Sequence, residues 1–340
     1  MNLIQAQSAN EVWRRAHELL RPEIIEGLSR SSRAGATFEL LHVAMEIEDP
    51  RQRWVAARQP PINPAFAIAE VIWILAGSNE SAVLNYWFPR LPQYSGEGST
   101  YAGAYGHRLR HHFGIDQVKR ACDVLAANPD SRQVVLQLWD VKQDLPGSFG
   151  EPRSQDIPCN IVSLLKVRNS RLEWTQVMRS NDLYRGLPYN LVQFTTLQEV
   201  MAGWLNLELG SYHHWSDSLH VYAEDTKTFT SADAPSEQNM DSLAMPTDQG
   251  CALIADLFAR LQTLIRPSLS ENNLSELTLL QDAPMAYRNL LAVLGAESAR
   301  KRGFVDLAES LAASCANRQL FQAWNRWNAW VGADRKVLVE

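Results

Sequence analysis

Cys159 is the residue whose surroundings most clearly suggest chemistry. It lies in Ile-Pro-Cys-Asn (157–160), where a proline precedes the thiol at the junction of a predicted loop and a predicted strand. A cysteine becomes a nucleophile when a neighbouring cation, helix N-terminus or base stabilises its thiolate. Cys122, Cys251 and Cys315 instead lie in helical segments, where a thiol is typically an inert packing residue. We therefore expect Cys159 to be the nucleophile.

Arg179 is predicted to lie beside Cys159. Asn169 and Ser170 separate two β-rich segments, 161–167 and 172–178, and this pattern favours a hairpin. In a hairpin the start of the first strand and the end of the second are neighbours, which brings Arg179 to Cys159. A cation there favours the thiolate and can also hold a phosphate.

Three further motifs surround this pair. Ser180 follows Arg179 directly, residues 186–190 are Gly-Leu-Pro-Tyr-Asn, and residues 218–222 are Ser-Leu-His-Val-Tyr. A thiol, an Arg-Ser pair, a turn that leads into a helix and a His-x-Tyr pair together predict a nucleophile beside a nucleotide-binding site. A cysteine hydrolase with His213, His214 or His220 as its base is the alternative, but it leaves the Arg-Ser and Gly-Leu-Pro-Tyr-Asn motifs without a role.

These motifs resemble the thymidylate synthase family, including the phage pyrimidine hydroxymethylases, over roughly residues 30–225. The resemblance implies that Cys159 attacks carbon 6 of a pyrimidine nucleoside monophosphate. Carbon 5 then accepts a one-carbon unit from 5,10-methylenetetrahydrofolate. The implied substrate-binding residues are Arg132, Arg179 and Ser180 for phosphate, Asn190 for the base, and His220 and Tyr222 for the sugar hydroxyl. The implied cofactor-binding residues are Asp182, which contacts the pterin, with Gly186 and Tyr189.

Two upstream residues complete the implied catalytic set of Cys159, Glu70, Tyr105, Asn190 and Arg179. Residues 67–73, Ala-Ile-Ala-Glu-Val-Ile-Trp, resemble the helix that carries the family's catalytic glutamate. Residues 104–106, Ala-Tyr-Gly, resemble the Tyr-Gly whose tyrosine helps to move the carbon 5 proton. Periodicity alone leaves Glu70 either exposed at a helix edge or buried, where an unpaired carboxylate is costly. The resemblance favours an acid–base and water-organising role.

The phosphate site is implied to extend across a homodimer. Ser-Arg-Gln (131–133) resembles the Ser-Arg-Arg that reaches the partner's phosphate, but Gln133 replaces the second arginine. The family's mobile N-terminal arginine corresponds to Arg30 or Arg33, and the spacing does not choose between them. We expect the open face of the sheet to form the dimer.

The product is the least determined part of the prediction. Asn160 replaces the usual histidine of the synthases, Ser218 replaces an aspartate, and the family's closing C-terminal segment has no recognisable counterpart. Water in the site would favour a hydroxymethyl product over a methyl product. We expect methyl if the helical region 250–330 covers the pocket and hydroxymethyl if it packs elsewhere. The sequence leans to methylation of dUMP to dTMP.

The identity of the base rests on Asn190. Its amide can read O4 and N3–H of uracil, whereas the cytosine enzymes of this family tend to carry aspartate at that place. The alternatives are 5-hydroxymethylation of dUMP, UMP, dCMP or CMP, and a non-catalytic homologue that only binds nucleotide.

The predicted elements form an α/β (α+β) fold with one large mixed sheet backed by helices. Helices are expected at 9–29, 63–77, 115–127 and 188–203, and strands at 36–48, 133–139, 161–167, 172–178, 208–212 and 218–222, with a loop at 141–157. Residues 1–230 are predicted to form the catalytic domain. Residues 231–246 resemble a linker, and 231–340 are predicted to form a helical region packed on that domain. Trp324, Trp327 and Trp330 favour such packing.

Composition excludes several classes of protein. A net charge of −6 over 340 residues argues against a nucleic-acid or anionic membrane surface. The four cysteines show no zinc spacing, so no metal site is predicted. The N-terminus does not resemble a signal peptide and no apolar run approaches membrane-spanning length, from which we expect a cytoplasmic protein.

Overall fold

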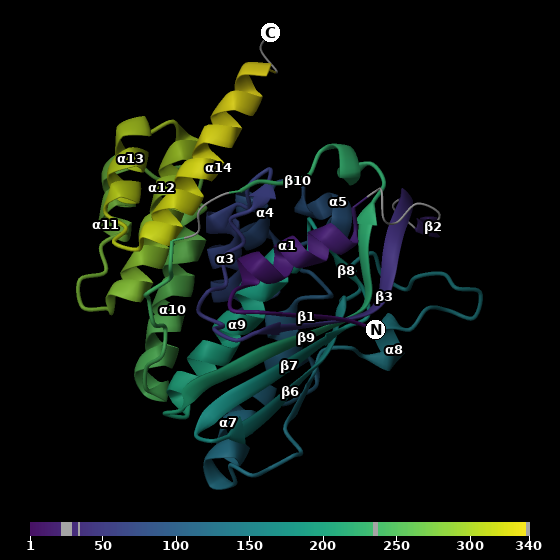
Figure 1. The fold of residues 1–340 in the computed structure, drawn as a ribbon. Helices are drawn as coiled ribbons and strands as arrows, with labels where there is room; N and C mark the ends of the chain where they lie inside the picture. The colour runs from purple at the N-terminus through teal and green to yellow at the C-terminus, as the bar shows by residue number, and fades with distance from the viewer. Residues whose placement is uncertain (22–28, 33–34, 234–236, 338–340) are drawn as a thin grey trace.

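The computed structural model describes residues 1–21, 29–32, 35–233 and 237–337. An eight-stranded mixed sheet lies at its centre, with the order β1–β3–β9–β7–β6–β5, while β2 pairs with β3 and β8 with β9 (Figure 1). The pairs β1/β3 and β7/β9 are parallel, and β3/β9 and β6/β7 are antiparallel. The strands are β1 (Asn2–Ala6), β2 (Ser29–Ser32), β3 (Gly35–Ile47), β5 (Val135–Gln137), β6 (Asn160–Arg168), β7 (Arg171–Met178), β8 (Asn181–Asp182) and β9 (Glu208–Tyr222). The predicted mixed sheet is confirmed.

Helices cover one face of this sheet. α1 (Ala9–Leu19) packs on β1 and β3, α9 (Leu187–Trp204) packs on β7 and β9, and α3 (Pro64–Leu75) packs on α9. Asn63 caps α3 by accepting a hydrogen bond from the Phe66 N–H, and Pro64 occupies the first turn, where its missing N–H is harmless. Shorter helices follow along the chain: α4 (Ser81–Trp87), α5 (Leu91–Ser95), α6 (Tyr105–His107), the π-helix η1 (Arg108–His112), α7 (Gln117–Ala127) and the 3₁₀ turn η2 (Asp225–Lys227).

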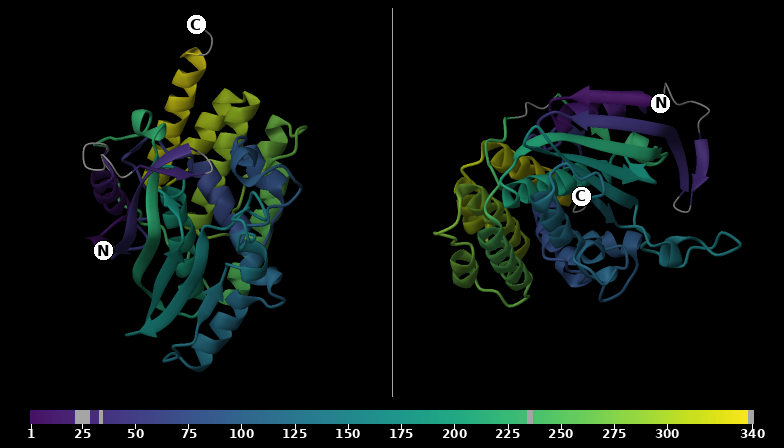
Figure 2. Two further views of the ribbon diagram at one scale, coloured as in Figure 1. Left: turned by 90° about the vertical axis from the view of Figure 1, so that its right-hand side faces the viewer. Right: turned by 90° about the horizontal axis from the view of Figure 1, so that it is seen from below.

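The other face of the sheet carries partly exposed side chains. Burial alternates along β7 and β9, as expected for a sheet with one covered face. Val177 pairs with Val162 on one side and with Trp215 on the other, and all three are half-buried. In the view from below in Figure 2, the strands lie together across the upper part, and the helices lie below and to the left of them. An apolar strip therefore lies on the uncovered face.

Five helices follow the sheet domain. α10 (Thr247–Leu264), α11 (Glu271–Leu277), α12 (Met285–Arg302), α13 (Val305–Ala313) and α14 (Arg318–Val337) form a layer beside α3 and α9, and the end of α14 projects away from the body (Figures 1 and 2). Trp324 is buried, and Trp327 Nε1 donates to Glu297 Oε1 at 3.3 Å, so these two tryptophans pack within this layer. No helix in the described part of the chain is long and apolar enough to cross a membrane.

Three predicted elements were wrong in their extent. The helix expected at 9–29 ends at Leu19, because Arg21 precedes a proline and is therefore pushed out of helical geometry, and Ser29 already belongs to β2. The strands expected at 208–212 and 218–222 are one strand, β9, because pairing with β3 and β7 continues through the polar residues between them. The expected loop at 141–157 contains α8 (Val141–Asp144), which Asp140 caps by accepting from Lys142 N–H.

Three short strands were not predicted. β1 pairs with β3 in parallel, and β10 (Thr230–Ser231) pairs with β4 (Arg58–Gln59). β10 lies at the beginning of the expected linker. Its pairing with β4 keeps the chain attached to the sheet domain after β9.

Candidate active site

The β6–β7 hairpin brings Arg179 to Cys159, as predicted. Arg179 N–H donates to Cys159 O at 2.9 Å, Arg179 Nε donates to Pro158 O at 3.0 Å, and Arg179 Nη2 donates to Ile157 O at 3.3 Å. The guanidinium carbon also lies 5.3 Å from the Trp139 ring centroid, a cation–π distance. Arg179 therefore fixes the backbone on which Cys159 is presented. Asn169 and Ser170 form the predicted turn, both with positive φ.

Tyr105 lies close to both Cys159 and Glu70. The next residue must be glycine, because a Cβ on Gly106 would lie 2.2 Å from the Ile74 carbonyl oxygen. Without a side chain there, α6 packs directly against α3, the helix that carries Glu70. Burial raises the pKa of the Tyr105 hydroxyl, and the neighbouring Cys159 and Glu70 raise it further. The Tyr105 hydroxyl is thus protonated at neutral pH.

Glu70 is a carboxyl group with one unsatisfied oxygen. Its Oε2 is shielded from solvent and has no hydrogen-bond partner in the described structure, while Gln193 on α9 hydrogen-bonds the carboxyl group. Burial raises the pKa of Glu70 to about 7, against the smaller opposing effect of the Gln193 hydrogen bond. A group with this pKa can both give and take a proton near neutral pH.

The Asn190 amide belongs to a buried chain of hydrogen bonds. Asn190 Nδ2 donates to Asn181 Oδ1 at 3.3 Å, and Asn181 Nδ2 donates to His214 Nε2 at 2.9 Å and to Ser216 Oγ at 3.2 Å. Burial lowers the pKa of His214 to about 3, so the ring is neutral. Since Nε2 accepts from Asn181, Nδ1 carries the proton and donates to Tyr212 OH, 3.0 Å away. This network determines which way the Asn190 amide faces.

Gly186 and Tyr189 shape the start of α9. A Cβ on Gly186 would lie 3.2 Å from Asn181 Oδ1 and 3.4 Å from Asn190 Nδ2, so a side chain would crowd the contact between the two amides. Tyr189 OH accepts from Asn63 N–H at 3.0 Å, which ties α9 to the N-terminus of α3. The structure therefore brings both residues to the site, where they hold the two helices in place.

Asp182, His220 and Tyr222 lie together on neighbouring strands. Asp182 pairs with His220 in the β8/β9 ladder, and the His220 and Tyr222 rings lie 5.5 Å apart and perpendicular. Asp182 Oδ1 accepts from the N–H groups of Tyr184 at 2.7 Å and Arg185 at 2.6 Å, while its buried Oδ2 has no partner among the residues described. Burial raises the pKa of Asp182 and lowers that of His220.

Asn160 takes the place next to the thiol. Ser163 Oγ donates to Gln176 Oε1 at 2.6 Å, so Gln176 Nε2 is free to donate to Asn160 Oδ1, at 2.8 Å. The Asn160 amide then lies beside the Tyr105 hydroxyl, whose pKa it lowers slightly against the stronger effect of burial. The hydrogen bond from Gln176 therefore holds the Asn160 side chain in a defined orientation within the site.

Several predicted phosphate ligands are not gathered at Cys159 within this chain. Arg132 is exposed on the loop before β5, whereas Ser180, half-buried between β7 and β8, directly follows Arg179 and so stays near Cys159. Arg30 lies on β2, where its carbonyl accepts from Thr37 Oγ1 at 3.4 Å, and Arg33 lies outside the described residues.

Three residues of the site were missed by sequence reasoning. Gln193 had a local signal, because it lies three residues after Asn190 and therefore on the same side of the helix. Asp156, which accepts from Gly103 N–H at 2.6 Å beside Tyr105, and Arg58 of β4 had none. Both come from segments whose position depends on tertiary pairing.

The site residues form a closed circuit of neighbours. Each influences the pKa of the next or hydrogen-bonds it, in the order Cys159, Tyr105, Glu70, Tyr189, Arg58, Asp182, His220 and Arg179, which returns to Cys159. A nucleophile, a group with a pKa of about 7 and two arginines are thus linked through their neighbours. This arrangement supports nucleophilic catalysis on a polar heterocycle.

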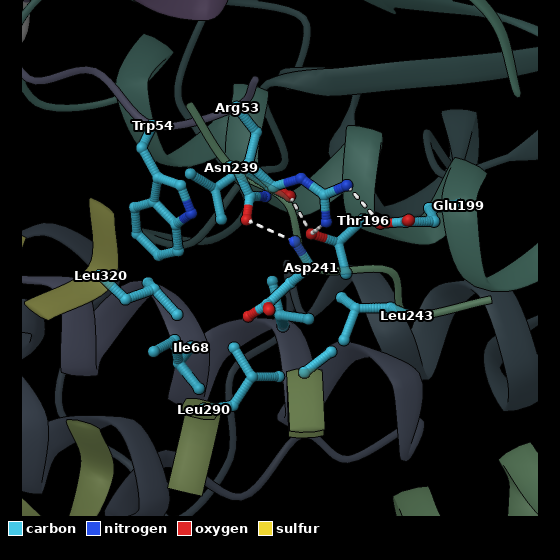
Figure 3. Close-up of a pocket in the computed structure, with 13 residues that line it drawn as sticks. Arg53, Trp54, Ile68, Thr196, Glu199, Asn239, Asp241, Leu243, Leu290 and Leu320 are labelled. Atoms are coloured by element: carbon cyan, nitrogen blue, oxygen red, sulfur yellow. Dashed lines mark hydrogen bonds and ion pairs between the residues drawn. The ribbon is translucent and has the colours of Figure 1, made fainter. Parts of the chain in front are cut away.

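A cavity of about 30 Å³ lies elsewhere, between the sheet domain and the C-terminal helices (Figure 3). Its polar groups are paired: Arg53 Nη1 donates to Thr196 Oγ1 at 2.8 Å, Arg53 Nη2 pairs with Glu199, and Asp241 accepts twice from Asn289. Its apolar lining includes Ile68 and Val71 of α3 and Val192 of α9. The cavity therefore belongs to the packing of the two layers.

The C-terminal helices contact the sides of α3 and α9 that point away from the site. Successive residues of a helix are rotated by about 100°, so Glu70 lies roughly 130° around α3 from the Ile68 and Val71 direction. By the same count, Asn190 lies roughly 150° around α9 from the mean direction of Val192, Thr196 and Glu199, which line the cavity. The C-terminal helices therefore lie behind the two helices that carry Glu70 and Asn190.

Comparisons with known proteins agree with these features. The model of the thymidylate synthase family matches residues 18–249. A deoxyuridylate hydroxymethyltransferase of Bacillus phage SP01 is 34% identical over 219 residues, which is 61% of this chain and 56% of that protein. One of Pseudomonas phage M6 is 35% identical over 202 residues, 58% of this chain and 56% of that protein. The bifunctional dihydrofolate reductase-thymidylate synthase of Paramecium tetraurelia is 34% identical over 114 residues, 32% of this chain and 22% of that protein. The chain thus spans about half the length of the phage relatives it matches.

Proposed function

Because the chain belongs to the thymidylate synthase family, we propose that it transfers a one-carbon unit from 5,10-methylenetetrahydrofolate to carbon 5 of a uracil nucleotide. The observation that carries this proposal is the closed circuit around Cys159, in which Tyr105, Glu70 and Arg179 are all neighbours of the thiol or of one another. The phage relatives' printed name, deoxyuridylate hydroxymethyltransferase, supports a deoxyuridylate substrate.

In this proposal Cys159 adds to carbon 6 of the pyrimidine and so makes carbon 5 nucleophilic, and it leaves carbon 6 as a thiolate when water or hydride adds to the new carbon. The Asn190 amide, oriented by Asn181, hydrogen-bonds the base. Arg179 holds the Cys159 loop, and with Ser180 it binds the phosphate. His220 and Tyr222, adjacent on β9, bind the sugar hydroxyl.

Proton movement is assigned to Glu70 and Tyr105. A Glu70 pKa of about 7 lets the carboxyl group exchange protons with the substrate or with ordered water at neutral pH. The raised pKa of Tyr105 keeps its hydroxyl protonated, so it relays the carbon 5 proton by donating its own proton to ordered water as it accepts that one. Asn160, beside this hydroxyl, orients it.

The residues present fit the folate donor at Asp182. A buried carboxylate oxygen without a partner suits the N–H donors of a pterin ring, and Asp182 Oδ2 is such an oxygen. Bound methylenetetrahydrofolate would supply the one-carbon unit and, for a methyl product, also the hydride. Gly186 and Tyr189 shape the adjoining wall at the start of α9.

We assign hydroxymethyl as the first candidate product, although the sequence alone leans to methyl. The helical region contacts the sides of α3 and α9 opposite to Glu70 and Asn190, so it does not take over the task of excluding water from the reacting carbon. The names of the phage relatives agree. Methyl is the second candidate, because the matching family is named for that activity.

The decisive experiment incubates the protein with dUMP and methylenetetrahydrofolate, identifies the nucleotide by mass, and follows dihydrofolate by absorbance. We expect 5-hydroxymethyl-dUMP without dihydrofolate. A methyl product with an equal amount of dihydrofolate would establish the second candidate. Parallel reactions with UMP, dCMP and CMP test the base and the sugar. If no nucleotide gains a carbon at position 5, the proposed function is wrong.

We also propose that the protein is a homodimer that uses the uncovered sheet face. Val162, Val177 and Trp215 form a half-buried apolar strip there, and Val135 on the neighbouring edge is 47% exposed. Apolar strips of this kind are typical of interfaces. A second copy on this face would allow the exposed Arg132 to reach its partner's phosphate site. Analytical ultracentrifugation tests this proposal, and a monomer at micromolar concentration would contradict it.

A further inference from the structure

Arg58 is a buried cation that the mechanism above does not use. Arg58 is 7% exposed, and neither its Nε nor its Nη1 has a hydrogen-bond partner within the described structure. The guanidinium group hydrogen-bonds Tyr189 and lies 4.8 Å from the Phe229 ring centroid. Buried arginine donors are normally satisfied, because an unpaired donor has lost its hydrogen bonds to water without replacement.

Two carboxylates near Arg58 are also incompletely bonded. Asp182 Oδ2 and Asp225 Oδ2 are buried without partners in the described part of the chain. Their other oxygens are engaged, since Asp182 Oδ1 accepts two backbone N–H groups and Asp225 Oδ1 accepts from Arg185 Nη2 at 2.7 Å. Both carboxylates act on the charge of Arg58, yet neither forms an ion pair with Arg58 in the described structure, and Asp225 pairs with Arg185 instead. A third group lying between Arg58 and these carboxylates would satisfy the unpaired atoms of both.

That group must present an acceptor to Arg58 and a donor to Asp182. A phosphate or carboxylate would meet the acceptor oxygens of Asp182 and Asp225 and be repelled. A neutral lactam fits, because its carbonyl oxygen accepts and its adjacent N–H donates. Resting on the proposed function, we propose that Arg58 and Asp182 together bind the lactam edge of the folate pterin, with Arg58 donating to the C4 carbonyl and Asp182 accepting from N3–H or the 2-amino group.

Arg58 is placed for this role by the short sheet at the end of the catalytic part. β10 pairs with β4, which holds Arg58 beside the segment that contains Asp225 and Phe229. Phe229 stacks on Tyr184 at 4.9 Å and covers one face of the guanidinium. Because the unpaired atoms are shielded from solvent, a covering side chain such as Phe229 has to shift when the pterin enters.

The test uses two ligands that differ at one position, folic acid with its 4-oxo group and the analogue with a 4-amino group. Binding to the protein in the presence of dUMP is measured by calorimetry. We expect Arg58→Met to weaken folic acid about ten- to a hundredfold, the typical effect of losing a charged hydrogen bond. The 4-amino analogue should change less than about threefold, because it offers Arg58 no acceptor. The affinity for dUMP should stay the same.

Two further variants make the result interpretable. Arg15→Met, on the exposed side of α1, should bind both ligands like the wild type. Arg58→Lys keeps a positive charge and should recover part of the preference for folic acid; it also carries the test if thermal unfolding shows that Arg58→Met does not fold. An equal loss for both ligands, or no loss, would overturn this inference alone. Failure of the wild type to bind either ligand while it binds dUMP would overturn the proposed function as well.

Discussion

The raised pKa of Glu70 predicts that the contribution of this residue to the unfolding free energy depends on pH. The carboxyl group has a pKa of about 7 in the folded protein against 4.5 for the ordinary group, because burial disfavours its charged form. A raised pKa favours folding below about pH 4.5, where the group is protonated in both states. This favourable contribution is lost as the pH rises through 4.5 to 7, because only the unfolded chain ionises readily. Glu70→Gln removes the ionisation and keeps the shape.

The size of the effect follows from the two pKa values. The interval from 4.5 to about 7, at about 1.36 kcal/mol for each pH unit, corresponds to about 3 kcal/mol of unfolding free energy. We therefore expect Glu70→Gln and the wild type to differ little at pH 4. At pH 8 the variant should be more stable by about 3 kcal/mol, reached progressively between these values. The same variant should lose turnover, because it can no longer exchange a proton.

Urea unfolding followed by tryptophan fluorescence at several pH values measures this difference. Glu276→Gln is the matched control, because it makes the same change at an exposed position on α11. Its effect should be small and should not grow with pH. If Glu70→Gln shifts stability by the same amount from pH 4 to pH 8, or destabilises increasingly at high pH, then Glu70 is not held in a site that disfavours its charge.

Four further outcomes are expected. Cys159→Ser should abolish turnover but retain dUMP binding by calorimetry, since a hydroxyl is a far weaker nucleophile; near-normal turnover would refute the mechanism. Asn190→Asp should shift the ratio of uracil to cytosine turnover about ten- to a hundredfold towards cytosine, and an unchanged ratio would remove its role in reading the base. Mixing Cys159→Ser with Arg132→Ala subunits should restore some activity through one intact site, and no recovery after verified exchange would contradict the shared site. Gly106→Ala should lower stability by about 1–3 kcal/mol in urea unfolding, because its Cβ would lie 2.2 Å from the Ile74 carbonyl oxygen; an unchanged midpoint would contradict the tight packing of α6 on α3.

Local patterns were sufficient to predict most of the fold. The alternating strands around Asn169 and Ser170, the helix that begins at Pro64 and the buried helix after Gly186 all have signals within a few residues of chain. The closeness of Arg179 to Cys159 followed from the same hairpin, because register in a hairpin is fixed by its turn. The family motifs could therefore be read before the fold was known.

The errors in the predicted elements arose where long-range pairing overrides local pattern. Residues 213–217 were left between two predicted strands, but they belong to β9 because β3 and β7 bond it on both sides. Similarly, β1 and β10 are too short to have a signal of their own and exist only through their partners. Pairing with distant strands supplies hydrogen bonds that a local sequence window does not show.

The electrostatics of the site were decided by tertiary structure alone. Glu70 could be exposed or buried from its periodicity, and only the packing of α3 on α9 gives it a pKa of about 7 and the neighbour Gln193. Arg58 had no motif, and it enters the site because β10 holds β4 beside Asp182 and Asp225. The side on which the C-terminal helices pack was equally open, although it bears directly on water access to the reacting carbon. Residue types thus determined the available chemistry, whereas desolvation and the distances between charges depend on which segments the folded chain brings together.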